Sequence, residues 1–290
     1  MITAILGVLG ILTIWFAFVF IKDYIANKNN LENNSFGKAV GIGFATDFFD
    51  TLGIGSFAPT TALLKFTKQT ADKFIPGTLN VSHTIPVVME AFIFITVISV
   101  EPVTLISLLA AAVIGAWIGA GIVSHLPEKK IQVTMGIALA ATAILMLLGQ
   151  LGVMPGGGDA TGLSGMKLVI GVVGNFILGA LMTAGIGLYA PCMALIYFLG
   201  MSPDVAFPIM MGSCAFLMPV AGVIFVKEAS YDRKTSMGIT IGGIVGVIIA
   251  AYLVKSLPID ILKWIVIAVI AYTSVTMLRS AAKNKDEISE

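Results

Sequence analysis

The sequence predicts an all-α polytopic membrane protein built on two inverted repeats, and three observations support this fold class. The 290 residues are 58% hydrophobic and 11% charged, with a mean hydropathy of +1.00, whereas an ordinary soluble domain is about 25% charged. The stretch TLGIGSFAPTTALLKF at 51–66 recurs 132 positions later as TAGIGLYAPCMALIYF at 183–198, with nine identical positions. Basic residues gather in some connections and avoid others, which predicts an orientation in the membrane.

Apolar runs long enough to cross a bilayer core of about 30 Å recur along the whole chain. Two of them, 37–66 and 167–199, are too long for one span and are interrupted by GIGSFAP and GIGLYAP. Each is either a kinked spanning helix or two half-helices that enter and leave on the same side. The first run, 2–21, lacks a basic leader and a cleavage site, so we expect a retained helix.

The lysine and arginine residues favour the half-helix alternative, because connections inside the cell carry the excess of them. If both broken segments are re-entrant hairpins, every basic connection lies inside and every poor one outside. Basic connections are 22–38, 65–73, 127–130, 227–234 and the tail, and poor ones are 101–102, 151–166 and 199–204. Loop 255–263, with Lys255 and Lys263, fits less well. We therefore expect a multi-pass protein of the cell membrane, with its N-terminus outside and its C-terminus inside.

The duplication divides the chain into two repeats with flanking segments. An N-terminal helix and basic loop (1–35) precede repeat 1, which is 36–150, with hairpin 37–66 and helices 78–100, 103–124 and 131–150. An extracytoplasmic glycine-rich connector, 151–166, leads to repeat 2, which is 167–280, with hairpin 167–199 and helices 205–226, 237–256 and 259–279; a cytoplasmic tail, 281–290, follows. Each repeat crosses the membrane an odd number of times, so the second is inverted relative to the first.

Paired breaks in corresponding positions of two halves are typical of a transporter's binding site. Glycines there permit tight backbone turns, and prolines suit the first turn of the returning half-helix. The half-helices are expected to begin at 60–61 and 192–193 and to direct free N–H groups toward the breaks, which favours a small anion. Close helix packing is the alternative role for these glycines. The residues predicted to bind substrate at the breaks are Thr51, Gly53, Gly55, Pro59, Thr60, Thr183, Gly185, Gly187, Pro191 and Cys192.

Short polar side chains on the helices after each hairpin extend the predicted site. Asn80 and Ser82 in segment 78–100, and Ser213 in segment 205–226, are expected to face the hairpin tips and to donate hydrogen bonds to a substrate oxyanion. Thr51 and Thr183 either join them or bond back within their own helices. Glycines spaced by four or eight are expected only to pack helices together; they are Gly115, Gly119, Gly238, Gly242 and Gly246.

Ionisable residues at membrane depth are candidates for coupling to a proton or a sodium ion. Asp47 and Asp50 lie three apart and share one helix face, and Glu90 lies near the middle of its segment. The alternative is that both aspartates lie near the cytoplasmic part of the hairpin, solvated or paired with a lysine. His83 could titrate near neutral pH, but its position favours a boundary histidine close to the lipid headgroups.

The sequence contains no phosphate loop, zinc spacing, Cys-x-x-Cys motif or basic stripe. We therefore expect no enzyme activity, no cofactor, no metal and no nucleic-acid partner; the expected partners are the lipid bilayer and a small anion, and the sequence leaves the oligomeric state open. Cys192 and Cys214 lie in apolar segments and are interpreted as small buried residues.

The duplicated pattern resembles the sulfite exporter TauE/SafE family, also called the toluene-sulfonate uptake permease family. The matching residues are GIGSFAPTTALLKF at 53–66 and GIGLYAPCMALIYFLGMSPDVAF at 185–207. The first repeat departs by carrying KQTA at 68–71 in place of the glycine and Ser-Pro of the following loop. The resemblance implies a carrier for sulfite, sulfonates, thiosulfate or related small organic anions. An anion channel on the same helix ends is the alternative, and a scaffold or receptor is disfavoured because no extramembrane domain is present.

Overall fold

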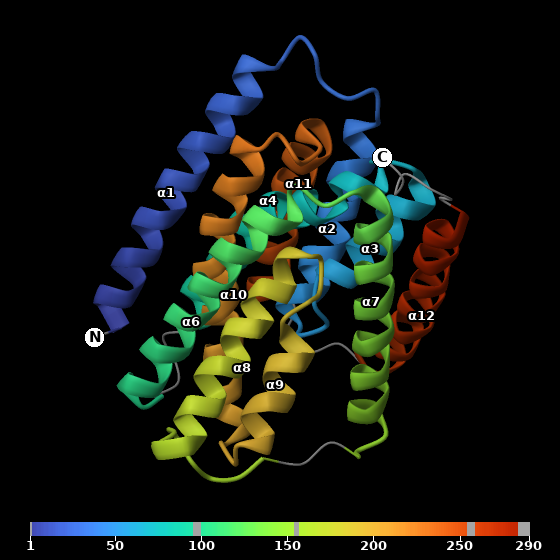
Figure 1. The fold of residues 1–290 in the computed structure, drawn as a ribbon. Helices are drawn as coiled ribbons and strands as arrows, with labels where there is room; N and C mark the ends of the chain where they lie inside the picture. Colours follow the sequence, from blue (N-terminus) through green and yellow to red (C-terminus); the bar gives the residue numbers. More distant parts are fainter. Residues whose placement is uncertain (1, 95–99, 154–156, 254–258, 284–290) are drawn as a thin grey trace.

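The computed structural model describes residues 2–94, 100–153, 157–253 and 259–283, and in these ranges every regular element is a helix (Figure 1). The predicted helix ends at 95–99 and 254–256, Lys255 and the tail beyond 283 lie outside them. The helices are α1(Ile2–Ala26), α2(Phe36–Thr51), α3(Phe57–Thr67), η1(Asp72–Phe74), α4(Ile75–Ser82), α5(Thr84–Phe94), α6(Pro102–Val123), α7(Glu128–Gln150), α8(Gly165–Thr183), α9(Tyr189–Phe198), α10(Pro203–Lys227), α11(Arg233–Leu253) and α12(Ile259–Lys283).

Seven of the described helices are long and apolar enough to cross a membrane, namely α1, α6, α7, α8, α10, α11 and α12. The sequence also predicts seven spanning helices, one before the repeats and three in each repeat, but one of the seven is a different helix. α8 has the length of a span, whereas the predicted spanning helix 78–100 is divided into α4 and α5 at His83. A chain with this many apolar helices is a multi-pass membrane protein.

The division between α4 and α5 has a local cause in Pro86. Proline has no backbone N–H, so the carbonyl of Ser82, four residues earlier, loses its helical partner. Thr240 of α11 replaces that partner, because its Oγ1 donates to the Ser82 carbonyl at 2.8 Å. The interruption places His83 at the junction of two short buried helices, which the hydropathy pattern alone did not reveal.

The long helices pack in pairs that join distant parts of the chain. α2 lies along α11, α8 lies along α6, and α7 packs against α12, while α10 occupies the centre of the bundle. Glycines allow the close approach: a Cβ on Gly119 would lie 2.6 Å from Thr183 Oγ1, and one on Gly238 would lie 2.7 Å from the Ala39 Cβ. At Gly115, Gly242 and Gly246 a Cβ would meet backbone carbonyls of the facing helix. The packing role predicted for these five glycines is confirmed.

Two turns lie inside the body of the bundle rather than at its ends. The turn at 52–56 joins α2 to α3, and the turn at 184–188 joins α8 to α9 (Figure 1). These are the two breaks, residues 52–56 and 184–188, that the sequence duplication predicts. Each duplicated segment therefore forms a helical hairpin, and most residues of the two tips are buried or half-buried.

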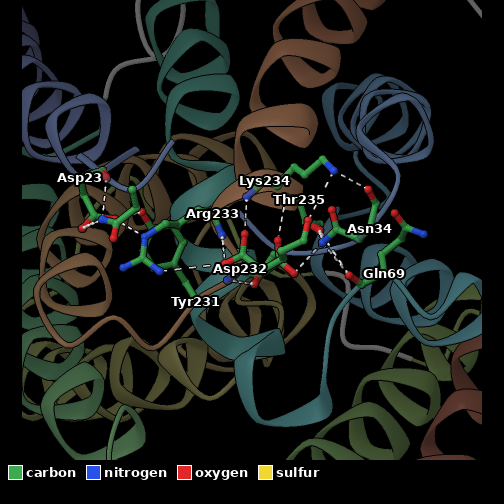
Figure 2. A network of polar contacts seen from close by, with 11 residues as sticks. Asp23, Asn34, Gln69, Tyr231, Asp232, Arg233, Lys234 and Thr235 are labelled. Carbon is green, nitrogen blue, oxygen red and sulfur yellow. Dashed lines mark hydrogen bonds and ion pairs between the residues drawn. The ribbon is translucent and has the colours of Figure 1, made fainter. Parts of the chain in front are cut away.

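A polar cluster ties together one end of the bundle (Figure 2). Asp23 at the end of α1 accepts hydrogen bonds from Tyr231 Oη at 2.6 Å and from Arg233 Nε at 2.7 Å. Asn34 Nδ2 donates to Asp232 Oδ2 at 2.8 Å and to the Gln69 carbonyl at 2.9 Å. These contacts join α1, the segment before α2, the loop after α3 and the start of α11.

Candidate functional site

Both hairpin tips line one cavity of about 480 Å³. The first tip contributes residues 53–58 and the second contributes 187–190. The tips also approach each other: a Cβ on Gly55 would lie 4.0 Å from Tyr189 Cδ2, and one on Gly187 would lie 3.9 Å from the Phe57 Cβ. Small-molecule sites typically occupy about 300–1,000 Å³. A cavity of ligand size therefore lies where the two tips approach each other.

The glycines at the tips differ in what they require of the backbone. Gly53, Gly55 and Gly185 have φ values of +88°, +89° and +93°, a region that side chains with a Cβ rarely adopt. Gly187 has no positive φ and faces the cavity. The first tip thus needs both of its glycines for its backbone, and the second needs only Gly185.

The returning helices begin earlier than the sequence indicates. α3 begins at Phe57 and α9 at Tyr189, so Pro59 and Pro191 occupy the third helical position. A proline is tolerated there because the first N–H groups of a helix have no intrahelical acceptor. The expected starts at 60–61 and 192–193 are wrong by about one turn. The free N–H groups belong to residues 57–58 and 189–190, which line the cavity.

Most of the remaining wall comes from α7, α12, α9 and α10, with Val87 of α5 and Met182 of α8; the parts from α7 and α12 were not predicted from the sequence. Most of these side chains are apolar or weakly polar, and two polar ones, Gln150 and Lys263, lie where α7 ends and α12 begins. The described residues of these walls are Thr142, Leu145, Met146, Gly149, Gln150, Gly152, Met193, Tyr197, Cys214, Lys263 and Ile270. The sequence held one indication of these walls: Lys263 lies in a connection that is expected to have few basic residues.

A buried chain of hydrogen bonds links α2, the α4–α5 junction and α3. Asp47 Oδ1 lies 2.7 Å from His83 Nδ1, and His83 Nε2 lies 3.0 Å from Thr60 Oγ1. All three residues are completely buried. The interpretation of His83 as a boundary histidine is wrong, because a proline-induced break turns it into the protein interior against Asp47.

Asp50 and Glu90 are buried beside the same cavity with hydroxyl groups as partners. Asp50 lines the cavity and its Oδ2 accepts from Ser56 Oγ at 2.8 Å. Glu90 Oε1 lies 2.8 Å from Thr51 Oγ1, and Glu90 Oε2 lies 3.3 Å from Tyr189 Oη. Burial also excludes the solvated alternative for Asp47 and Asp50, which are at most 1% exposed.

Two of the polar residues expected to face the tips, Asn80 and Ser213, hydrogen-bond to backbone or to a neighbouring side chain, whereas Ser82 Oγ is buried with no hydrogen-bond partner among the described residues. Asn80 Nδ2 donates to the Pro76 carbonyl at 2.9 Å and lies 3.4 Å from the Thr183 carbonyl, at the end of α8. Ser213 Oγ accepts from Asn175 Nδ2 at 2.8 Å, and Thr183 bonds back to the Ala180 carbonyl. Of the predicted residues, the described cavity wall includes Asp50, Gly53, Gly55 and Gly187. The others are not among the residues that line it: Thr51, Pro59, Thr60, Asn80, Ser82, Thr183, Gly185, Pro191, Cys192 and Ser213.

The chain matches a model of a known protein family. The family model described as Sulfite exporter TauE/SafE matches residues 1–146 and 167–289, which is nearly the whole chain. The interval between the two matched parts, 147–166, covers the connector between α7 and α8 together with the last turn of α7 and the first two residues of α8. No curated protein and no solved structure matches the chain.

Proposed function

The chain belongs to the sulfite exporter TauE/SafE family, and we propose that it is a secondary transporter that carries a small anion across the cytoplasmic membrane by alternating access. The anion is sulfite, a sulfonate or a related sulfur-containing organic anion. One observation carries the proposal: two tips that the sequence relates by duplication line a single cavity in the middle of a membrane bundle. Such a placement is typical of carriers built from broken helices.

An inverted-repeat relationship between the halves is supported by equivalent helix contacts. A Cβ on Gly115 of α6 would meet the Phe176 carbonyl of α8, and a Cβ on Gly246 of α11 would meet the Phe44 carbonyl of α2. Phe176 follows Phe44 by the 132-residue offset of the duplication, and Gly246 follows Gly115 by 131. Each hairpin thus packs on a helix of the other repeat through the same contact.

Alternating access is supported by the difference between the two ends of the bundle. The cavity extends to the end where α7 finishes and α12 starts, at Gln150 and Lys263. The polar cluster of Figure 2 ties together the opposite end, where α11 begins. In the proposed orientation the structure is open to the outside and closed to the cytoplasm.

Anion selectivity is proposed to come from the helix starts at the tips. The N–H groups of residues 57–58 and 189–190 have no intrahelical acceptors and lie at the cavity. A helix start carries about half a positive elementary charge, which attracts an anion. Lys263 adds a cationic side chain to the same wall. Lys263 lies on the side where the orientation predicts few basic residues, and in this proposal it belongs to the transport route.

Counterflow in proteoliposomes tests the transporter proposal. Radiolabelled sulfite is supplied outside, with sulfite, thiosulfate, sulfonates, sulfate or carboxylates trapped inside. Accumulation of label driven by a trapped sulfur anion is the expected result, because only a carrier exchanges one substrate for another. If folded protein gives no accumulation with any trapped anion, the carrier proposal fails for this substrate class, and electrical recording then tests the channel alternative.

Leucine substitutions at the tips test the location of the site. Gly55→Leu and Gly187→Leu each place a side chain into the cavity that both glycines line, so we expect transport to be abolished while folded protein remains in the membrane. Gly7→Leu is the matched control, because nothing lies within 4 Å of a Cβ at Gly7 on α1. Transport retained in either tip variant would contradict the proposed site.

A further inference from the structure

The hydrogen bonds around Glu90 can all be formed only if this carboxyl group carries a proton. Thr51 Oγ1 lies 2.8 Å from the Asp47 carbonyl and 2.8 Å from Glu90 Oε1, and both of those atoms are acceptors when Glu90 is ionised. A threonine hydroxyl has a single hydrogen. If Glu90 is protonated on Oε1, it donates to Thr51, and Thr51 donates to the Asp47 carbonyl. Glu90 Oε2 then accepts from Tyr189 Oη at 3.3 Å.

Burial supports the same protonation state. Glu90 is completely buried, and its hydrogen-bond partners are the hydroxyl groups of Thr51 and Tyr189. An ionised carboxylate in such surroundings is costly unless it is paired with a cation. Two acids of α2, Asp47 and Asp50, lie close to Glu90. A negative charge on either aspartate would repel a negative charge on Glu90.

Glu90 is connected to both hairpin tips and therefore to the cavity. Thr51 is the last residue of α2, directly before the first tip, and Tyr189 is the first residue of α9 and lines the cavity. An anion in the cavity and an ionised Glu90 would be two like charges in a medium of low dielectric constant, where their repulsion is strong. Substrate binding and protonation of Glu90 consequently favour each other.

We propose that Glu90 is the coupling residue: it binds one proton when the substrate anion binds and releases it when the anion leaves, which makes the protein a proton–anion symporter. The inference rests on the proposed transport function. The proton on Glu90 comes from the side to which the cavity opens, and it is lost to the other side together with the anion. An antiporter would need an ionised Glu90 beside the bound anion, which like-charge repulsion opposes.

Several titratable groups face Glu90 from the elements packed around it. They are Asp47 and Asp50 of α2, Tyr189 of α9 and Cys214 of α10; His83, between α4 and α5, contacts Asp47. α1 and α11 also pack on α5, and their titratable residues lie in their terminal turns. Asp50 is the competing coupling candidate, because it lines the cavity itself.

Transport driven by a proton gradient tests the proposal. Wild type, Glu90→Gln, Asp50→Asn and Glu228→Gln are compared in proteoliposomes with a sulfonate that supports counterflow, because a sulfonate stays ionised across the pH range used. One inward pH unit is about 1.4 kcal/mol, so we expect up to about tenfold accumulation in wild type. Glu90→Gln keeps a donor for Thr51 and an acceptor for Tyr189; we expect its exchange to continue and its gradient-driven accumulation to fall to about onefold.

The outcomes separate this inference from the transport proposal. Glu228→Gln changes an exposed acid between α10 and α11 and should accumulate like wild type. Tenfold accumulation by Glu90→Gln, or loss of it in Asp50→Asn alone, overturns the role of Glu90. Drive by a sodium gradient instead of a proton gradient overturns proton coupling. Absence of counterflow in wild type contradicts the transport function instead.

A second variant keeps the inference testable if Glu90→Gln fails to fold. Tyr189→Phe removes one hydroxyl and introduces the aromatic residue that the first repeat carries at the matching position 57. A hydrogen bond from Tyr189 stabilises ionised Glu90 more than neutral Glu90. Its removal should move the pH of half-maximal exchange upward, and an unchanged pH profile would count against Glu90.

Discussion

The two hairpin tips share a backbone design but differ in their surroundings. Gly53 and Gly185 hold the same positive-φ position, and both tips line one cavity. Near the first tip lie the buried acids Asp47, Asp50 and Glu90, whereas the positions 132 residues later carry glycine, methionine and glycine. Duplication thus preserves the shape of the site, while the ionisable groups, and with them the proposed coupling, belong to one half.

The second repeat has a polar residue of its own, one turn away. Asn175 Nδ2 donates to the Leu108 carbonyl and to Ser213 Oγ, both at 2.8 Å. Its counterpart in the first repeat is Gly43, where a Cβ would meet the backbone of Ile239 on α11. Conversely, Gly179 is the counterpart of Asp47, and a Cβ there would meet the backbone of Ala112 on α6. At these two positions each hairpin has one glycine at a helix crossing and one polar side chain, in opposite order.

Removing Asp47 from the first repeat should therefore lower the free energy of unfolding more than removing Asn175 from the second. Asp47→Ala leaves His83 Nδ1 buried without its partner, and breaking a buried pair in this way costs about 3–5 kcal/mol. Asn175→Ala removes neutral hydrogen bonds, which costs about 1–3 kcal/mol. The measurement is the free energy of unfolding of the purified protein in detergent. Asp47→Asn, which keeps an acceptor for His83, is the control, and an equal loss in both alanine variants would contradict the comparison.

Alanine at the tips should distinguish the two backbones by a smaller amount. Gly55 has φ of +89°, so Gly55→Ala is expected to cost about 1–2 kcal/mol. Gly187 has no positive φ and a Cβ there would make an ordinary contact at 3.9 Å, so Gly187→Ala should stay within about 0.5 kcal/mol. Thermal unfolding of both variants measures the difference. Similar melting temperatures would show that the first tip tolerates a Cβ.

The smallest expected effect concerns the starts of α6 and α11, which hold equivalent positions in the two repeats. The acid before each helix should contribute to stability with a pH dependence of opposite sign. Hydrogen bonds from the Thr104 hydroxyl and from the backbone N–H groups of Thr104 and Val103 lower the pKa of Glu101, before α6. Burial raises the pKa of Asp232, before α11. Glu101 should therefore stabilise the fold above the ordinary Glu pKa and lose this effect as the pH falls through its lowered value. Asp232 should stabilise less as the pH rises from the ordinary Asp pKa through its raised value.

Melting temperatures of Glu101→Gln and Asp232→Asn across the acidic range measure these contributions. Each amide variant should lose the pH dependence of its own residue and keep that of the other. If both variants change the melting curve in the same direction on acidification, the two helix starts are not opposite in sign.

Much of the candidate site follows from local sequence. Gly-x-Gly followed by Ala-Pro inside an apolar run predicts a turn and a new helix, because glycine adopts positive φ and proline suits a first helical turn. Repetition of that pattern predicts two equivalent tips, and both tips line the cavity. Helix-packing glycines were also predictable, since their four-residue spacing places them on one face. The first turn of each returning helix was displaced because proline is tolerated at more than one position in it.

The partners of each side chain could not be read from the sequence. Segment 78–100 looks like one spanning helix, yet Pro86 divides it and turns His83 toward Asp47, 36 residues earlier. The walls from α7 and α12 are ordinary apolar helices whose contribution depends on packing against the tips. Hydropathy reports only that a residue is buried, and it does not report against what.

The sequence by itself determined that this chain is a membrane protein with two interrupted helical segments, because length, hydropathy and turn chemistry are local properties. The tertiary structure alone decided that Glu90 of the first repeat meets Tyr189 of the second, and that Lys263 lies on the wall of the same cavity. The Glu90–Tyr189 contact joins residues 99 positions apart, and the cavity wall brings Lys263 of α12 together with tip residues 53–58 of the first half. Long-range packing therefore places the charged groups that the proposed transport requires.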